Sequence, residues 1–295
     1  MAELVARTMT TDTLHWRGKE AVFATMHGKE RAIAPLASRW LGLRLVVADG
    51  LNTDAFGTFT RDISRPGSSR DAARVKIDAA FAMSPERPIG LASEGSFGPH
   101  PQLPYCALDR EIVLLVDREH GFEIVGHFAT PDTNYGHSVV TDVANGVAFA
   151  ERAGFPDHGV IVMGCRDGDP APAIAMFKDI ANVEALIAAL NDVIVNCGAA
   201  WIETDMRAHR NPRRTRAIKY AMLDLLCRAR SRCPECGQPG YAVTGRIAGL
   251  PCAACGEPTS LARADVVTCS GCHQRAERAS PRTVADPGHC GACNP

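Results

Sequence analysis

Eight cysteines near the end of the chain limit its fold more than any other feature. They form four Cys-x-x-Cys pairs, separated by 15, 13 and 17 residues: Cys233/Cys236, Cys252/Cys255, Cys269/Cys272 and Cys290/Cys293. A pair on a tight turn directs two thiolates at one ion, and two such turns complete a tetrahedral site. Glycine and proline in "CPECGQPG" and "CAACGEPT" suit such turns. The spacing therefore predicts a metal-binding module.

We expect this module to hold two structural zinc ions, because eight thiolates fill both sites and leave no position for a catalytic water. Free structural cysteines and disulfides are the alternatives, and both are less suited to four regular pairs in an intracellular chain. Joining the first pair to the second and the third to the fourth gives compact ribbons and is the expected pairing. A crossed pairing stays open.

The composition is that of an ordinary globular protein. The chain has 295 residues, of which 46% are apolar and 22% charged, and its net charge is −1. This charge provides no general attraction to nucleic acid or membrane. The sequence has neither an apolar run of the ~20 residues that span a bilayer nor a secretory signal at its start. We expect a cytoplasmic protein without a membrane partner.

The cysteine distribution divides the chain into an N-terminal extension at 1–20, a domain at 21–232 and a double zinc ribbon at 233–295. The middle part alternates strand and helix patterns, which predicts an α/β domain with a mixed sheet and flanking helices. Strands are expected at 20–28, 43–50, 88–95, 159–164 and 201–206, and a hairpin at 111–130. Helices are expected at 29–42, 68–83, 182–197 and 211–230.

One carboxylate occupies an unusual position in "GLASEGSFGPHP". Glu94 follows an apolar strand pattern and lies among small residues, so we expect it at a strand end, in a glycine-rich turn. A site explains an acid in such a turn better than packing does.

Other charged residues match the parts of a phosphate site that uses Mg²⁺. Lys29 begins a helix after a glycine, where backbone N–H groups and an ammonium group can hold phosphate together. Asp71 and Lys76 share the helix at 68–83, and carboxylates such as Asp71 and Glu94 are ligands for Mg²⁺. For each of these residues taken singly, a simpler explanation is at least as good: compensation of the helix dipole for Asp71, an ordinary exposed lysine for Lys29 and a solvated face for the arginines. The remaining candidates stand before or within the last basic helix: His209, Arg210, Arg214 and Arg216. We expect this helix to pack one apolar face on the sheet, with Arg213, Arg214, Arg216 and Lys219 at its start or outer face. The apolar face consists of Ile218, Ala221, Met222, Leu225 and Leu226.

The order of these parts resembles the inosine/xanthosine triphosphate pyrophosphatases, which hydrolyse unusual purine nucleoside triphosphates. The resemblance is carried by "FATMHGKERAI", by "FGTFTRDISRPGSSRDAARVKIDAA", by "IGLASEGSFG", by the hairpin and by "RRTRAIKYAMLDL". Ala208-His209-Arg210 is similar to the family's Ser-His-Arg. The whole chain, through "SEGSFGPHP", "ETDMRAH" and "CNP", also resembles an uncharacterised bacterial family, which implies no function.

The first resemblance implies a Mg²⁺-dependent nucleoside triphosphate pyrophosphohydrolase. Asp71 and Glu94 would hold metal or activate water, Lys29, Lys76, Arg214 and Arg216 would hold phosphates, and His209 and Arg210 would lie near the base. The alternative is a protein whose zinc ribbons and basic helix bind nucleic acid or a protein partner, with the α/β domain as an inactive scaffold. A homodimer is compatible with either function.

Overall fold

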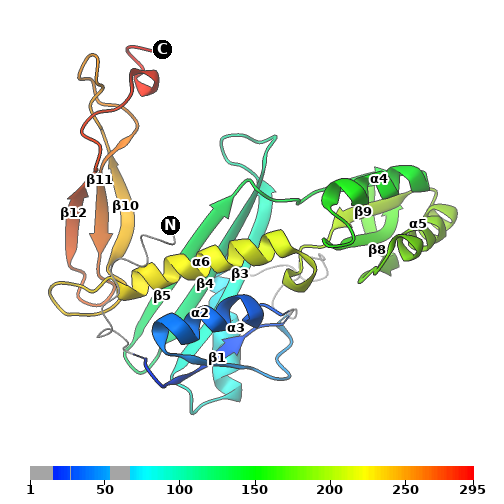
Figure 1. Ribbon diagram of the computed structural model, residues 1–295, viewed down its shortest axis with the longest axis horizontal. Coiled ribbons are helices and arrows are strands. Elements are labelled where there is room, and N and C mark those ends of the chain that lie inside the picture. Colours follow the sequence, from blue (N-terminus) through cyan, green and yellow to red (C-terminus); the bar gives the residue numbers. More distant parts are fainter. Residues whose placement is uncertain (1–15, 27, 54–66) are drawn as a thin grey trace. The chain divides into compact units, whose positions relative to one another are not determined.

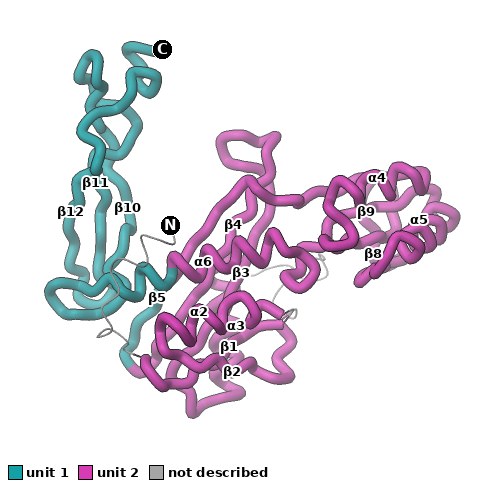
Figure 2. Tube along the Cα trace, in the orientation of Figure 1, with its two compact units in different colours: residues 1–13, 120–124, 225–295 teal, residues 14–119, 125–224 magenta. Residues whose placement is uncertain are grey.

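The computed structural model describes residues 16–26, 28–53 and 67–295. Most of the extension expected at 1–20, and His27 beside Lys29, lie outside the described residues. The chain divides into two compact units (Figure 2). Unit 1 consists of residues 1–13, 120–124 and 225–295, and unit 2 consists of residues 14–119 and 125–224. The division falls inside the last long helix, shortly before the boundary expected at Arg232.

The first sheet of unit 2 is mixed, as the sequence predicts (Figure 1). Its strand order is β2-β1-β3-β4-β5; β1 is parallel to both β2 and β3, and β3 is antiparallel to β4. The strands are β1 (Glu20–Ala24), β2 (Arg44–Val47), β3 (Ile89–Pro99), β4 (Ala107–Asp117) and β5 (Phe122–Thr130). The last strand, β5, begins in unit 1 and continues into unit 2.

The strand that carries Glu94 is longer than expected, because β3 does not end in a glycine turn. It continues to Pro99 and pairs with β4 over its whole length, so Glu94 lies in mid-strand opposite Ile112. The small residues serve packing within the sheet: a Cβ atom on Gly95 would lie 2.3 Å from the carboxylate of Glu111. The expectation of a strand end was wrong because it treated glycines as turn residues.

Three helices accompany this sheet: α2 (Glu30–Leu41), α3 (Ser69–Met83) and α6 (Pro212–Arg230). Apolar residues of α3, such as Ile77, share a core cluster with Val22, Ala92 and Leu114 of the strands. The predicted apolar face of α6 is confirmed. Its five residues are at most 1% exposed: Ile218, Ala221, Met222, Leu225 and Leu226. Among the described residues, no helix is both long and apolar enough to cross a bilayer.

The second sheet of unit 2 is antiparallel, with the order β6-β9-β7-β8. Its elements follow one another between β5 and α6: β6 (His137–Val140), α4 (Val143–Ala153), β7 (Val160–Arg166), β8 (Asp169–Phe177), α5 (Val183–Cys197) and β9 (Ala200–Thr204). Both helices contribute to one core with the sheet. They pack closely because Gly146 has no side chain; a Cβ atom there would lie 2.5 Å from Leu190. The sequence pattern did not predict β6, α4 or β8.

Unit 1 contains a three-stranded antiparallel sheet made of β10 (Ala242–Ala248), β11 (Ala262–Thr268) and β12 (Arg275–Ala279), with β11 in the centre. Its hydrophobic cluster is small. The buried members are Cys233, Tyr241, Val267 and Cys269, and two of these four are cysteines of the predicted metal sites.

Candidate functional site

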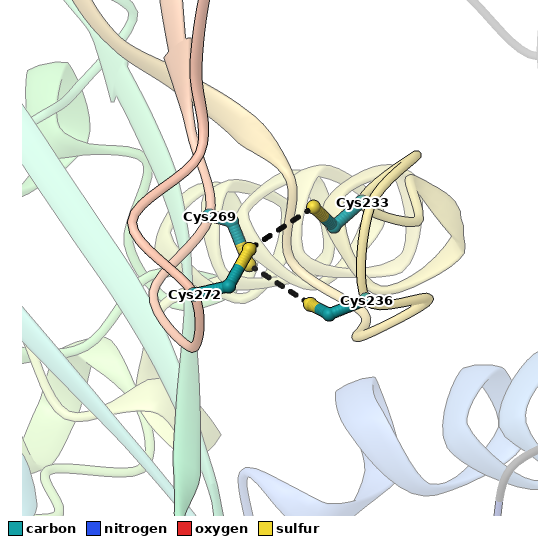
Figure 3. A group of neighbouring side chains, drawn as sticks. All are labelled: Cys233, Cys236, Cys269 and Cys272. Atoms are coloured by element: carbon teal, nitrogen blue, oxygen red, sulfur yellow. Dashed lines mark hydrogen bonds between the residues drawn. The ribbon is translucent and has the colours of Figure 1, made fainter.

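The eight cysteines of unit 1 form two separate clusters of four. One cluster contains Cys233, Cys236, Cys269 and Cys272 (Figure 3), and the other contains Cys252, Cys255, Cys290 and Cys293. Within each cluster all four sulfur atoms lie within 4.8 Å of one another. We call them the first and the second cysteine cluster.

The pairing of the Cys-x-x-Cys turns is crossed, so the expected sequential pairing was wrong. The reason is the antiparallel sheet. Each strand carries the chain from one end of the sheet to the other, so turns separated by one strand lie at opposite ends. The pair before β10 therefore meets the pair after β11, and the pair after β10 meets the pair after β12.

The sulfur positions fit a bound metal ion. The distances between sulfurs of different turns are 3.5 Å for Cys233–Cys272, 3.6 Å for Cys236–Cys269 and Cys255–Cys290, and 3.9 Å for Cys252–Cys293. A tetrahedral site with metal–sulfur bonds of about 2.3 Å has sulfur–sulfur edges of about 3.8 Å. A disulfide bond would require about 2.05 Å. Both clusters can thus hold zinc or another metal that prefers four thiolates.

The electrostatics of the clusters also call for a cation. Backbone N–H groups of Cys255 and Ala254 lower the pKa of the Cys252 thiol to about 7. Contacts with the sulfurs of Cys255 and Cys252 raise the pKa of Cys293 to about 12. Four thiols at this separation cannot all ionise without a compensating positive charge, and a metal ion supplies that charge.

Unit 2 contains a second group of charged residues, which is buried. Glu94 and Lys76 form an ion pair, although they are only 2% and 6% exposed. The ammonium group of Lys29 donates a hydrogen bond of 2.8 Å to the carbonyl oxygen of Ser93. Burial lowers the pKa of Lys29 to about 8; Arg214 and Lys76 act in the same direction, and Glu94 opposes them. Lys29, Lys76 and Glu94 therefore lie together.

Arg214 belongs to the same group. It was expected at the start or the outer face of α6, but it is 1% exposed and its Nε donates to Oε1 of Glu111 at 2.7 Å. Its guanidinium group also donates to the carbonyl oxygen of Met206. Asp109 lies nearby on β4, and burial together with Glu111 raises its pKa to about 8, while Arg214 opposes the rise.

The sequence analysis missed Asp109 and Glu111. Their signal was two acidic residues at alternating positions of "ALDREIVLLVD", directly before an apolar strand. Alternating positions point to the same face of a sheet. We call the six buried residues the charge cluster: Lys29, Lys76, Glu94, Asp109, Glu111 and Arg214.

Asp71 is not buried with the charge cluster. It is exposed and forms a capping box with Ser68 at the start of α3, where its carboxylate accepts bonds from the Ser68 backbone N–H at 2.9 Å and hydroxyl at 2.7 Å. These bonds lower its pKa. Its carboxylate is used at the helix N-terminus, which agrees with the helix-end explanation that the sequence left open.

Unit 2 also contains a cavity of about 520 Å³. Its described lining contains four basic side chains and no acidic one: Gly28, Arg31, Ala208, His209, Pro212, Thr215, Arg216 and Lys219. The distance from Nε2 of His209 to Oδ1 of Asp179 is 3.7 Å, and the distance from Nη2 of Arg216 to Oδ2 of Asp132 is 3.9 Å. Among the described residues, Arg31 and Lys219 have no ion-pair partner. Arg210 is absent from the lining and donates a bond to the carbonyl oxygen of Ile180.

The cavity and the charge cluster share two chain segments. Gly28 and Arg31 flank Lys29, and Pro212 and Thr215 flank Arg214. The structure therefore places three predicted residues, Lys29, Lys76 and Glu94, in one cluster with Arg214. It places His209 and Arg216 in the lining of the cavity. Asp71 and Arg210 belong neither to the charge cluster nor to the described lining.

Comparison with known proteins identifies a family but no described activity. No curated protein matches the chain. A family described as "Domain of unknown function (DUF6671)" matches residues 80–295, which include most of unit 2 and all eight clustered cysteines. Since the match extends over most of the sequence, the chain belongs to the DUF6671 family.

Proposed function

We propose that the chain is a Mg²⁺-dependent nucleoside triphosphate pyrophosphohydrolase whose unit 1 is held together by two structural zinc ions. One observation carries the proposal for unit 2: four basic side chains line a cavity, and the lining comes from the same chain segments as Lys29 and Arg214 of the buried charge cluster. Its volume lies within the range of small-molecule sites. Cations that line a cavity favour a ligand with several phosphate charges.

In the proposed reaction, water attacks the α-phosphorus of the nucleotide. The bond from that phosphorus to the bridging oxygen breaks, and pyrophosphate leaves with the electron pair. A carboxylate accepts the proton from water, and Glu94 is the candidate because it is buried in an ion pair with Lys76. Arg31, Arg216 and Lys219 offset the charge of the phosphate chain at the cavity.

The test is pyrophosphate release from a panel of purine and pyrimidine nucleoside triphosphates, with zinc-loaded protein and Mg²⁺. Replacing Arg31 or Lys219 with Gln removes one charge from the cavity, and we expect KM to rise roughly tenfold. Arg213→Gln is the matched control, because Arg213 is exposed, pairs with Asp132 and is absent from the described lining of the cavity. Absence of pyrophosphate release from every nucleotide would refute the proposal.

Zinc is the metal we propose for both cysteine clusters. Four thiolates at tetrahedral spacing select zinc or iron, and zinc is the common structural ion. Elemental analysis and native mass spectrometry should find two zinc ions per chain. A single iron held by four cysteines would colour the protein. Disulfides among the eight cysteines in mass spectra would exclude both metals.

The alternative, nucleic-acid binding by unit 1, has less support from its charge. Residues 225–295 contain eight arginines, no lysine and five acidic residues. Each zinc ion with four thiolates carries a net charge of −2. The metal-loaded segment therefore has no net positive charge with which to attract phosphate backbones. Salt-dependent binding to oligonucleotides without hydrolysis of nucleotides would favour this alternative.

A further inference from the structure

One acidic residue of unit 2 has a left-handed backbone that no local turn explains. Among the described residues, three residues other than glycine have this conformation: Asp167, Asp179 and His273. Asp167 and Gly168 both have positive φ in the two-residue turn between β7 and β8, which is usual for a hairpin. His273 lies in a cysteine turn, at a position that is glycine in two of the other turns. Asp179 (φ 58°) lies between β8 and α5, and strained residues of this kind concentrate at functional sites.

The carboxylate of Asp179 is held in a fixed direction. Nη2 and Nη1 of Arg207 donate to Oδ1 and Oδ2 of Asp179 at 2.8 Å and 3.3 Å. Arg207 is fixed in turn by Asp205, which is 0% exposed and accepts from Nε at 3.0 Å and from Nη2 at 2.7 Å. A guanidinium group that binds both oxygens sets the plane of a carboxylate. The side chain of Asp179 is nevertheless 58% exposed, so its other side faces solvent.

Asp179 is ionised at neutral pH and therefore only accepts hydrogen bonds. Burial alone would raise the pKa of Asp179, but the hydrogen bond and the charge of Arg207, together with His209 and Arg210, lower it. Each carboxylate oxygen can accept more than one hydrogen bond, so the exposed side keeps acceptor capacity beside the bonds from Arg207. The chemical group that fits this side is an O–H or N–H donor.

Asp179 also stands next to the basic cavity. Nε2 of His209, a residue of the lining, is 3.7 Å from Oδ1 of Asp179. From Pro212 to Lys219, the lining extends about 10 Å along α6. A phosphate chain can thus lie along Arg216 and Lys219 while the group attached to it reaches His209 and Asp179.

We propose that Asp179 is a specificity-determining residue of the cavity, which accepts a hydrogen bond from an O–H or N–H group attached to the phosphate chain of the ligand. The inference rests on the proposed function for the phosphate chain. It adds the class of ligand, which is a nucleotide with a donor on its sugar or base, as opposed to an inorganic polyphosphate. Carboxylates recognise ribose hydroxyls in the same way in dinucleotide-binding domains.

A second acid near the lining lacks the properties of Asp179. Oδ2 of Asp132 is 3.9 Å from Nη2 of Arg216, and its Oδ1 pairs with Arg213, whose side chain is 44% exposed. The backbone of Asp132 is not left-handed. Asp132 therefore offsets the charge of two exposed arginines, and it serves as a control for Asp179.

The experiment compares the affinities of the zinc-loaded protein for inorganic tripolyphosphate and for the α,β-methylene analogue of GTP, by calorimetric titration. The ratio of the two affinities separates donor recognition from the general attraction of phosphates. Asp179→Asn removes the charge and keeps a residue that adopts the left-handed conformation readily, so we expect it to lower the ratio for the GTP analogue about tenfold. Asp132→Asn and Asp167→Asn are the matched controls and should leave the ratio unchanged.

An unchanged ratio in Asp179→Asn would overturn the inference, and so would equal weakening of both ligands, which indicates a structural role. Asp179→Gly relieves the strained backbone and should lower the ratio as much, in case Asp179→Asn does not fold. The 2′,3′-dideoxy form of the GTP analogue identifies the donor. If its affinity no longer depends on Asp179, the donor is a sugar hydroxyl, and if the dependence remains, the donor is on the base.

Pyrophosphate release from unmodified nucleotides separates this inference from the proposed function. A lowered ratio in Asp179→Asn without pyrophosphate release in the wild type refutes the proposed function and retains the donor site. Pyrophosphate release with an unchanged ratio refutes the inference alone. Absence of binding of both probes to the wild type would overturn both.

Discussion

Units 1 and 2 both bring ionisable side chains together, but in different ways. Unit 1 gathers eight thiols around two points, and two of these cysteines belong to a hydrophobic cluster with Tyr241 and Val267. Unit 2 buries carboxylates beside lysine and arginine side chains, and its two sheets have larger apolar cores. In unit 1 a bound metal ion could supply the counter-charge for the thiolates, whereas the carboxylates of unit 2 face lysine and arginine side chains.

This difference shows how size limits the means of stabilisation. A small segment cannot bury enough apolar surface to offset the conformational entropy of folding, so metal binding must supply the remainder. A larger domain can tolerate several buried ion pairs, because apolar burial offsets the cost of their desolvation. The predictions below test this contrast, beginning with the largest expected effect.

Removal of the metal should unfold unit 1 and leave unit 2 folded. Zinc binding contributes on the order of 10 kcal/mol in small structural sites, which is comparable to the whole stability of a small domain. Hydrogen exchange after chelation should show loss of protection in 242–279 and retained protection in β3 and β4. Loss of protection in both units together would mean that they fold as one cooperative unit.

The crossed pairing makes a more specific prediction for cysteine variants. With ¹¹³Cd in place of zinc, Cys233→Ser should remove the metal resonance that couples to Cys269 and Cys272. The resonance that couples to Cys252 should remain, because that cysteine belongs to the other cluster. In the wild type, coupling of one cadmium resonance to both Cys233 and Cys252 would show that the pairing is sequential and not crossed.

Two neighbouring arginines provide the sharpest test of buried charge in unit 2. Arg214→Ala leaves the carboxylate of Glu111 buried without its ion-pair partner, so we expect a loss of about 3–5 kcal/mol in the free energy of unfolding. Arg213→Ala removes an exposed pair with Asp132 and should cost no more than about 0.5 kcal/mol. Urea denaturation of both variants measures the difference; similar losses would contradict the burial of Arg214.

The stability of unit 2 should pass through a minimum near pH 8 when no divalent cation is added. The pKa of Asp109 rises from 3.8 to about 8 on folding, so the folded state holds an extra proton and stability decreases as the pH rises between these values. The pKa of Lys29 falls from 10.5 to about 8, so stability increases as the pH rises above 8. The limb below pH 8 should be the larger of the two, because the pKa of Asp109 shifts further than that of Lys29.

Denaturant titrations across this pH range, with single variants, assign the two limbs. Asp109→Asn should flatten the limb below pH 8, and Lys29→Met should flatten the limb above it. A monotonic profile in the wild type would show that neither group has the shifted pKa described above.

The smallest expected effect concerns the backbone of the cysteine turns. The residue after the second cysteine has a left-handed conformation in three turns: Gly237 (φ 71°), Gly256 (φ 79°) and His273 (φ 61°). A non-glycine residue is strained there, so His273→Gly should stabilise unit 1 by up to about 1 kcal/mol. Gly237→Ala should destabilise it by a similar amount, as measured by the thermal midpoint; a stabilising Gly237→Ala would contradict this conformation.

Local sequence patterns predicted the elements whose signal lies within a few neighbouring residues. The helices α2, α3, α5 and α6 follow from apolar spacing and end residues, and the apolar face of α6 is buried as predicted. β6, α4 and β8 were missed. The α4 segment "VANGVAFAERA" has few large apolar residues, and its packing depends on contact between Gly146 and Leu190. Such a contact joins distant parts of the chain and has no local signature.

In the candidate sites, too, local sequence patterns identified residue types but not the contacts between distant segments. Cys-x-x-Cys spacing determined which residues can bind metal, because two thiols on one turn need no other part of the chain to point together. The antiparallel order of β10, β11 and β12 decides which turns meet. Likewise, acidic and basic residues could be recognised in the sequence, but only the long β3–β4 pairing and the position of α6 bring Glu111 to Arg214 and bury both. Burial and counter-charge arise from contacts between distant segments, and these contacts are a property of the tertiary structure.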